Sequence, residues 1–133
     1  SAIGPAMRNI SGRLDQAVAA FVNDIYQRGL DQDVLLVISG EFGRTPRINN
    51  TAGRDHWPLL STLALSGGGL RMGQTIGVAS QRAEYPQERA ITPQDLMATI
   101  FQFMGLPLDL TYTDHSGRPT MMLQDGRPIT ELF

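Results

Sequence analysis

The stretch Val34-Leu-Leu-Val-Ile38 decides the fold class that this sequence predicts. It is a continuous apolar run without polar alternation, which is typical of a strand buried on both faces of a parallel sheet. Before it, apolar residues recur at helical spacing over residues 7–28, and Gly29 stands where a left-handed C-cap is expected. A helix, a short turn and a buried strand together predict an α/β architecture with a mostly parallel central sheet flanked by helices.

Downstream segments predict further elements of this architecture. Residues 59–65 form a second apolar strand, and the three glycines at 67–69 form a tight turn. Residues 74–79 form a third strand, which we expect to pair with the second as a hairpin. A second helix begins at the N-cap Thr92 and stops at Gly105.

Length and composition limit the function classes. A chain of 133 residues with 41% hydrophobic residues predicts a single globular domain over residues 1–133. The net charge of −2 provides no basic field, so we expect neither nucleic acid nor an anionic membrane as a partner. The chain has no cysteine, which excludes disulfides and thiolate chemistry. Its six methionines are predicted to fill the core.

A long polar segment, residues 39–58, carries the residues most able to do chemistry. It follows the predicted buried strand, and open α/β sheets bind ligands at the carboxyl ends of their strands. Asp55 and His56 offer a carboxylate and an imidazole to a divalent ion, and Glu41 could supply a third ligand. The alternative is structural, with Asp55 in a turn and His56 stacked beside Trp57.

Three arginines in the same segment, Arg44, Arg47 and Arg54, could clamp a sulfate or phosphate group. The alternative is again structural, because Glu41 and Asp55 could pair with these arginines and hold the segment together. The residue pattern alone favours the structural interpretation.

Several motifs resemble a bacterial family catalogued only as a domain of unknown function (number fifteen-oh-one). The resemblance covers nearly the whole chain, in order, and rests on five segments: Val37-Ile-Ser-Gly-Glu-Phe-Gly-Arg-Thr-Pro, Gly53-Arg-Asp-His-Trp, Gly67-Gly-Gly-Leu-Arg-Met-Gly-Gln-Thr-Ile-Gly, Thr92-Pro-Gln-Asp-Leu-Met-Ala-Thr-Ile, and Gly117-Arg-Pro with Asp125-Gly-Arg-Pro-Ile-Thr-Glu-Leu. That family is placed in the alkaline phosphatase and sulfatase superfamily, whose members are longer and often exported.

The resemblance implies that this chain is the C-terminal segment of a longer sulfatase-like domain with an alkaline phosphatase-like fold. It implies a metal-dependent sulfatase or phosphatase-like hydrolase that is inactive as this fragment. Asp55, His56 and Glu41 would hold Zn²⁺, Ca²⁺, Mg²⁺ or Mn²⁺, and Arg44 would contact a sulfate or phosphate ester, on a small molecule or a polysaccharide. The whole protein would be exported, to the periplasm.

One departure from the superfamily pattern supports a different function. Members typically end the equivalent strand with an Asp-His metal pair, but this sequence has Glu41-Phe42 there, and phenylalanine cannot bind a metal. The alternative is therefore a non-catalytic binding or scaffold protein that retains the fold without the chemistry. Because a piece of a larger sheet exposes edges and apolar faces, we also expect this fragment to form a homo-oligomer.

Overall fold

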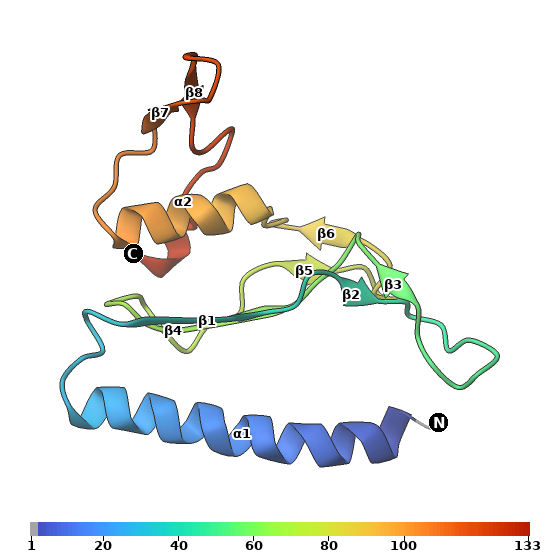
Figure 1. Ribbon diagram of the computed structural model, residues 1–133. Helices are drawn as coiled ribbons and strands as arrows, with labels where there is room; N and C mark the ends of the chain where they lie inside the picture. Colours follow the sequence, from blue (N-terminus) through green and yellow to red (C-terminus); the bar gives the residue numbers. More distant parts are fainter. Residues whose placement is uncertain (1–2) are drawn as a thin grey trace. The chain divides into compact units, whose positions relative to one another are not determined.

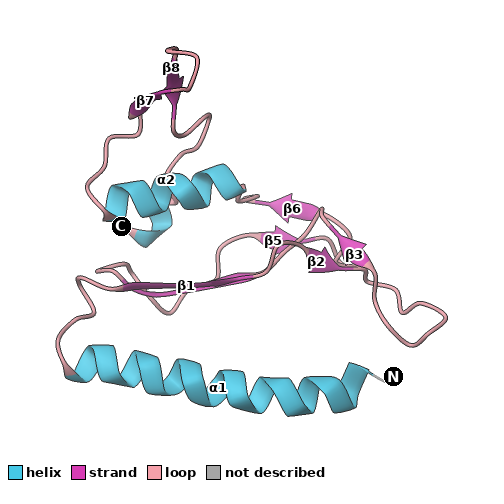
Figure 2. Ribbon diagram, in the orientation of Figure 1, coloured by secondary structure: helices cyan, strands magenta, loops and turns pink. Residues whose placement is uncertain are grey.

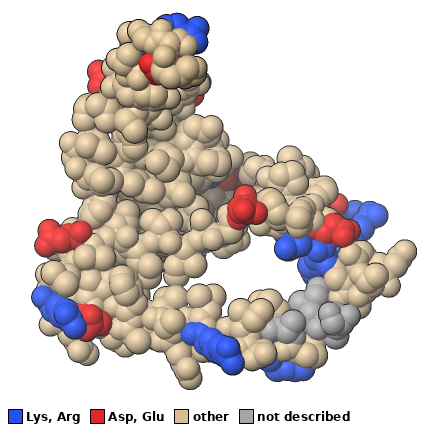
Figure 3. All heavy atoms as spheres, in the orientation of Figure 1, with Lys and Arg blue, Asp and Glu red and all other residues tan. Residues whose placement is uncertain are grey.

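The structure is a computed structural model that describes residues 3–133. The chain forms two compact units, Ser1–Glu88 and Arg89–Phe133, each with its own set of elements (Figure 1). The strands are short, whereas α1 (Ile3–Gln27) is a long helix (Figure 2). On the face drawn in Figure 3, basic and acidic side chains occur in small groups. Within the described range, neither helix combines the length and hydropathy needed to cross a bilayer.

The first unit begins with α1, Ile3–Gln27, which confirms the predicted helix. Gly29 has a φ of 68°, and the Leu30 N–H donates to the Ile25 carbonyl at 2.9 Å, which closes the helix as a left-handed C-cap does. Ile25 is buried at the carboxyl end of the apolar face, and α1 contacts β4. Several apolar residues nearer the start of the helix are exposed: Met7, Ile10, Leu14 and Phe21.

A long interrupted hairpin follows α1. Its outer ladder pairs β1, Leu35–Ser39, with β4, Leu63–Gly67, and its inner ladder pairs β2, Gly43–Arg44, with β3, His56–Trp57. Both ladders are antiparallel. Between them the first arm advances four positions, from Ser39 to Gly43, and the second arm takes six, from Trp57 to Leu63. The second arm therefore has two more residues than the first, and its residues 58–62 form a bulge between the two ladders.

The predicted mostly parallel central sheet is wrong, and with it the alkaline phosphatase-like fold. Every strand pair among residues 3–133 is an antiparallel two-stranded sheet. The apolar run does form a strand, but its residues are half-buried rather than fully buried. Such a run indicates apolar contacts on both faces and does not fix strand direction. Direction follows from the connection, and here the chain turns straight back on itself.

The expected pairing of the second and third strands is also wrong. β4 begins four residues later than predicted and pairs with β1. The third strand, β5 (Val78–Ala79), pairs with β6 (Pro86–Glu88). The tight glycine turn is confirmed, since residues 67–69 have φ values of 80°, 67° and 66°.

The second unit is organised by α2, Pro93–Phe103, whose predicted caps are confirmed. Thr92 and Asp95 form a capping box, and Gly105, with a φ of 68°, follows the C-cap. Ala98, Phe101 and Leu123 form the core of the unit. The remaining elements of the unit are β7 (Thr111–Thr113), β8 (Pro119–Met121) and a 3₁₀ turn (Thr130–Leu132).

Polar contacts tie the C-terminal segment of this unit to α2 and to Arg89, which precedes that helix. The Arg89 guanidinium binds the Glu131 carboxylate through two hydrogen bonds of 2.5 and 2.8 Å, and this pairing lowers the pKa of Glu131 to about 2. Asp95 accepts from the backbone N–H groups of Thr92 and Arg127, which lower its pKa. Hydrogen bonds to the charged form of each carboxyl group favour it over the neutral form.

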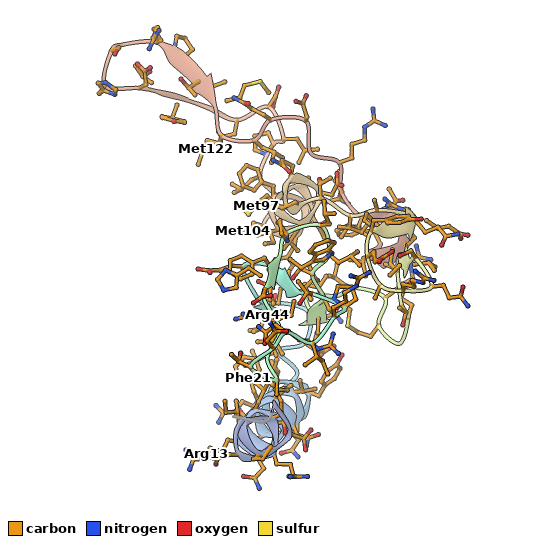
Figure 4. All side chains as sticks on the ribbon, turned by 90° about the vertical axis from the view of Figure 1, so that its right-hand side faces the viewer. Arg13, Phe21, Arg44, Met97, Met104 and Met122 are labelled. Carbon is orange, nitrogen blue, oxygen red and sulfur yellow. The ribbon has the colours of Figure 1, made fainter. Side chains whose placement is uncertain are left out.

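The prediction that the methionines fill the core is wrong, because all six are exposed: Met7, Met72, Met97, Met104, Met121 and Met122. Met97 and Met104 project from the same side of α2 (Figure 4), as their seven-residue spacing requires. Helical periodicity identified the apolar face of α2, but only Ala98 and Phe101 of its apolar residues are buried.

We expect Thr99→Val to destabilise the second unit by about 1–3 kcal/mol. Thr99 is fully buried, and its Oγ1 donates to the Asp95 carbonyl at 2.7 Å and accepts from the Ile129 N–H at 2.9 Å. Valine keeps the shape but leaves that buried N–H without a partner. Thermal unfolding by circular dichroism measures the loss. Thr130→Val, at an exposed position in the same unit, is the control, and equal effects of both variants would contradict the assignment.

Candidate functional site

The inner ladder of the hairpin places Arg44 directly opposite His56. The Thr45 N–H donates to the Asp55 carbonyl at 3.0 Å, so the pair next to Arg44 and His56 is a hydrogen-bonded one. Because the two types of pair alternate along an antiparallel ladder, Arg44 and His56 form a non-hydrogen-bonded pair, in which side chains lie closest. Both residues are exposed. A guanidinium and an imidazole thus stand side by side on one face.

Phe42 is the platform of this face. Its ring centroid lies 4.1 Å from that of His56, with 38° between the planes. The Arg44 Cζ lies 5.9 Å from the same centroid, within cation–π range. We call these three residues, Phe42, Arg44 and His56, the Arg44 face. Figure 4 shows the Arg44 side chain.

The Arg44 guanidinium keeps most of its donors available. One nitrogen, Nη1, donates to the Arg54 carbonyl at 3.3 Å, which connects the side chain to the segment just before β3. A guanidinium carries five N–H donors in a planar fork that matches two oxygens of a sulfate or phosphate group. The remaining donors of Arg44 can therefore bind an oxyanion beside the His56 imidazole.

Arg54 has a structural role instead. Its Nη1 donates to the carbonyls of Thr45 and Pro46 at 2.6 and 2.8 Å, so it holds the two arms together. The structural interpretation of the sequence predicted that these arginines form ion pairs with Glu41 and Asp55. Within residues 3–133, the ion pairs formed are Arg28–Asp24, Arg89–Glu131 and Arg118–Asp114, none of them in this loop.

Asn49 organises the tip of the hairpin and was not identified from the sequence. Its Oδ1 accepts from the backbone N–H groups of Thr51 and Gly53 and from the Thr51 hydroxyl, at 2.9–3.1 Å. Its Nδ2 donates to the Asp55 Oδ1 at 2.8 Å. The run Asn49-Asn-Thr-Ala-Gly53 has the composition of such a turn, and that signal could have identified it.

The residues predicted to bind a metal do not come together. Successive side chains of an extended strand point to opposite faces, so Asp55 and His56 diverge. Asp55 engages Asn49, while His56 stacks on Phe42 rather than beside Trp57 as the structural alternative had it. In the part of the chain described, no three histidine, aspartate or glutamate side chains are grouped to hold an ion. These residues therefore do not fit a divalent metal by themselves.

Trp57 anchors the inner ladder to the second hairpin of the same unit. Its indole Nε1 donates to the Glu84 carbonyl at 2.7 Å, and its side chain is half-buried. Gly43, next to Phe42 and Arg44, lies against the bulge at residues 58–62, because an ideal Cβ there would be 1.8 Å from the Leu60 carbonyl oxygen. Both contacts fix the backbone that carries the Arg44 face.

Comparisons with known proteins identify a family for the chain. No curated protein and no solved structure matches it. The family described as "Protein of unknown function (DUF1501)" matches residues 1–133, which is the whole chain. The chain is therefore a member of the DUF1501 family.

Proposed function

We propose that the Arg44 face binds the oxyanion of sulfate or phosphate esters in a sulfatase- or phosphatase-like hydrolase. The observation that carries this proposal is the cross-strand pair of exposed Arg44 and His56 on the Phe42 ring. The cation supplies charge and paired donors, and the aromatic platform reduces the freedom of both side chains. Such pre-positioned donors stabilise negative charge better than mobile ones.

In this proposal each residue of the face has one role. The Arg44 guanidinium binds two non-bridging oxygens of the ester. The His56 imidazole donates a proton to the leaving oxygen while a water molecule attacks the sulfur or phosphorus atom. The proton that the water loses returns to the imidazole, and the products are the alcohol and inorganic sulfate or phosphate. Phe42 orients both groups. No step is assigned to a metal ion, because the described residues do not assemble a site for one.

Two further parts of the proposal rest on the family resemblance. One is that the DUF1501 family belongs among sulfatase-like proteins and that this chain is the C-terminal part of a longer member. The other is that the whole protein is exported. Both would be supported by an active, exported full-length protein in which Arg44 and His56 are required for ester hydrolysis.

Arg44→Gln is expected to weaken sulfate and phosphate binding by about tenfold or more, since a charge-assisted hydrogen bond contributes about 1.5–3 kcal/mol. Inorganic sulfate and phosphate are titrated into the full chain while the His56 ring resonances are followed by NMR. Arg47→Gln is the matched control, because it removes an exposed arginine of the same loop. Equal losses in both variants, or no response of His56 to either anion, would refute the assignment.

A second candidate function is a non-catalytic binding protein. The observation that favours it is the hydrogen bond from the Asn49 amide to the Asp55 carboxylate, which gives that carboxylate a structural role within the loop. Assays of the full-length protein with aryl sulfate and aryl phosphate distinguish the two candidates. Turnover that depends on Arg44 supports the hydrolase, and anion binding without turnover supports the binding protein.

A further inference from the structure

Ser80 is a buried polar residue to which the proposed function gives no role. It is 9% exposed and follows β5 in the first unit. Its Oγ accepts from the backbone N–H groups of Glu84 and Tyr85 at 3.0 and 3.4 Å. Its backbone N–H donates to the Tyr85 carbonyl at 2.9 Å, and its carbonyl accepts from the Ala83 N–H at 2.7 Å. Ser80 therefore holds residues 80–85 as a closed turn.

This turn sets the direction of the Glu84 carbonyl, which accepts from the Trp57 indole at 2.7 Å. The Glu84 carbonyl and the Tyr85 N–H are the two ends of one planar peptide unit. Because the Ser80 Oγ binds the N–H end, it also fixes where the carbonyl end points. The hydroxyl, the peptide unit and the indole thus form a short chain of hydrogen bonds, in which each bond strengthens the next.

Trp57 depends on this acceptor because the inner ladder gives it little support. Its cross-strand neighbour is Gly43, which has no side chain to pack against the indole. The β2–β3 ladder contains two residue pairs, and so short a ladder is marginally stable without outside contacts. The hydrogen bond to Glu84 supplies such a contact from a segment outside the hairpin.

The position of Trp57 in turn determines that of His56. Successive side chains of an extended strand point to opposite faces, so a strand whose Trp57 is held on one face presents His56 on the other. The His56 ring then lies 4.1 Å from the Phe42 ring, opposite Arg44. The His56 imidazole has no hydrogen-bond partner among residues 3–133, so its placement depends on the backbone of β3 and on Phe42.

We propose that Ser80 is a positioning residue of the Arg44 face, acting through the Glu84 carbonyl and Trp57. The inference rests on the proposed function in one respect, that the Arg44 face binds an oxyanion. Its geometric part does not, because Ser80 keeps the His56 ring on Phe42 in the absence of any anion. Groups that are placed in advance bind an anion without a further loss of side-chain freedom, so removal of the Ser80 hydroxyl weakens binding.

The His56 ring resonances test the geometric part in the full chain without anion. The ring current of Phe42 displaces the resonances of a ring stacked on it upfield, and Phe42→Leu gives the reference without that current. Ser80→Ala removes the hydroxyl oxygen, and Trp57→Phe removes the indole N–H but keeps an aromatic ring. We expect each of these two variants to lose most of the displacement.

Two controls accompany these variants. Gln81→Ala changes an exposed position of the same turn and should keep the displacement, which makes its loss specific to the contacts of Ser80. His115, the other histidine of the chain, lies in the second unit. Its ring resonances should be the same in every variant, which shows that the second unit remains folded.

Inorganic phosphate, titrated into the same proteins, tests the consequence for binding. Ser80→Ala and Trp57→Phe should each weaken binding by about three- to tenfold, as expected for the loss of one hydrogen bond, and Gln81→Ala by less than about twofold. If both variants keep the wild-type His56 resonances and lose only stability in urea, Ser80 is structural and the proposal is overturned. Loss of the displacement with wild-type phosphate affinity also overturns it. A wild type that binds no phosphate refutes the proposed function, while loss of the displacement in both variants still supports the positioning of His56 by Ser80.

Discussion

Gly67→Ala will lower the free energy of unfolding of the first unit by about 2–5 kcal/mol. Gly67 has a φ of 80°, which costs an alanine about 1–2 kcal/mol. An ideal Cβ there would also lie 2.4 Å from the Val34 carbonyl oxygen, so the β1–β4 ladder must shift, at a further cost of about 1–3 kcal/mol. Urea denaturation followed by the fluorescence of Trp57, the single tryptophan, measures the change.

Gly73→Ala separates the two contributions to this loss. Gly73 has a nearly identical φ of 78°, but an added Cβ would meet no atom within 4 Å. Its replacement should therefore cost only the backbone strain, about 1–2 kcal/mol. If both alanine variants lose the same stability, the close approach of Gly67 to Val34 has no energetic consequence.

The second large effect is expected at Gly43, within the hairpin that carries the Arg44 face. Its φ lies outside the left-handed region, so alanine suits the backbone and only the space is limiting. The ideal Cβ would lie 1.8 Å from the Leu60 oxygen and 2.9 Å from its carbonyl carbon. Gly43→Ala should cost about 2–4 kcal/mol and separate β2 from the bulged arm.

Separation of β2 from β3 would also remove the pairing of Arg44 with His56. Gly43→Ala should therefore abolish the response of His56 to sulfate and phosphate. Gly40→Ala, where the nearest atom to an added Cβ lies at an ordinary 3.6 Å, is the control and should change stability by less than about 1 kcal/mol. Wild-type anion binding by the Gly43 variant would contradict the proposed dependence of the site on the inner ladder.

The carboxyl end of α1 and both ends of α2 were predicted well because their signals are local, whereas α1 begins four residues before the predicted residue 7. Thr92 and Asp95 form a capping box within one turn, and Gly29 and Gly105 end their helices through their own backbone conformation. Strand direction depends on where the chain returns. The apolar run at 34–38 is compatible with either direction, and the shift between the two ladders comes from the extra length at residues 58–62.

The candidate site was predicted in part for the same reason. The sequence showed that Arg44 and His56 lie in the polar segment 39–58. It did not show that they lie opposite each other, because this depends on the register of β2 and β3. The same register places the Phe42 ring against both His56 and Arg44. From the sequence, Phe42 was noted only as a residue that cannot bind a metal. Likewise, the divergence of Asp55 and His56 follows from extended backbone and not from their adjacency.

The nesting of one ladder inside the other has a consequence for the order of folding. β1 and β4 are distant in sequence, and bringing them together costs loop entropy that grows with the length of free chain between them. The β2–β3 ladder closes a shorter loop, whose tip is already ordered by the Asn49 side chain. Once it forms, only short segments remain to be closed. We therefore expect this protein to zip its long hairpin from the tip outward, with β1 and β4 pairing last.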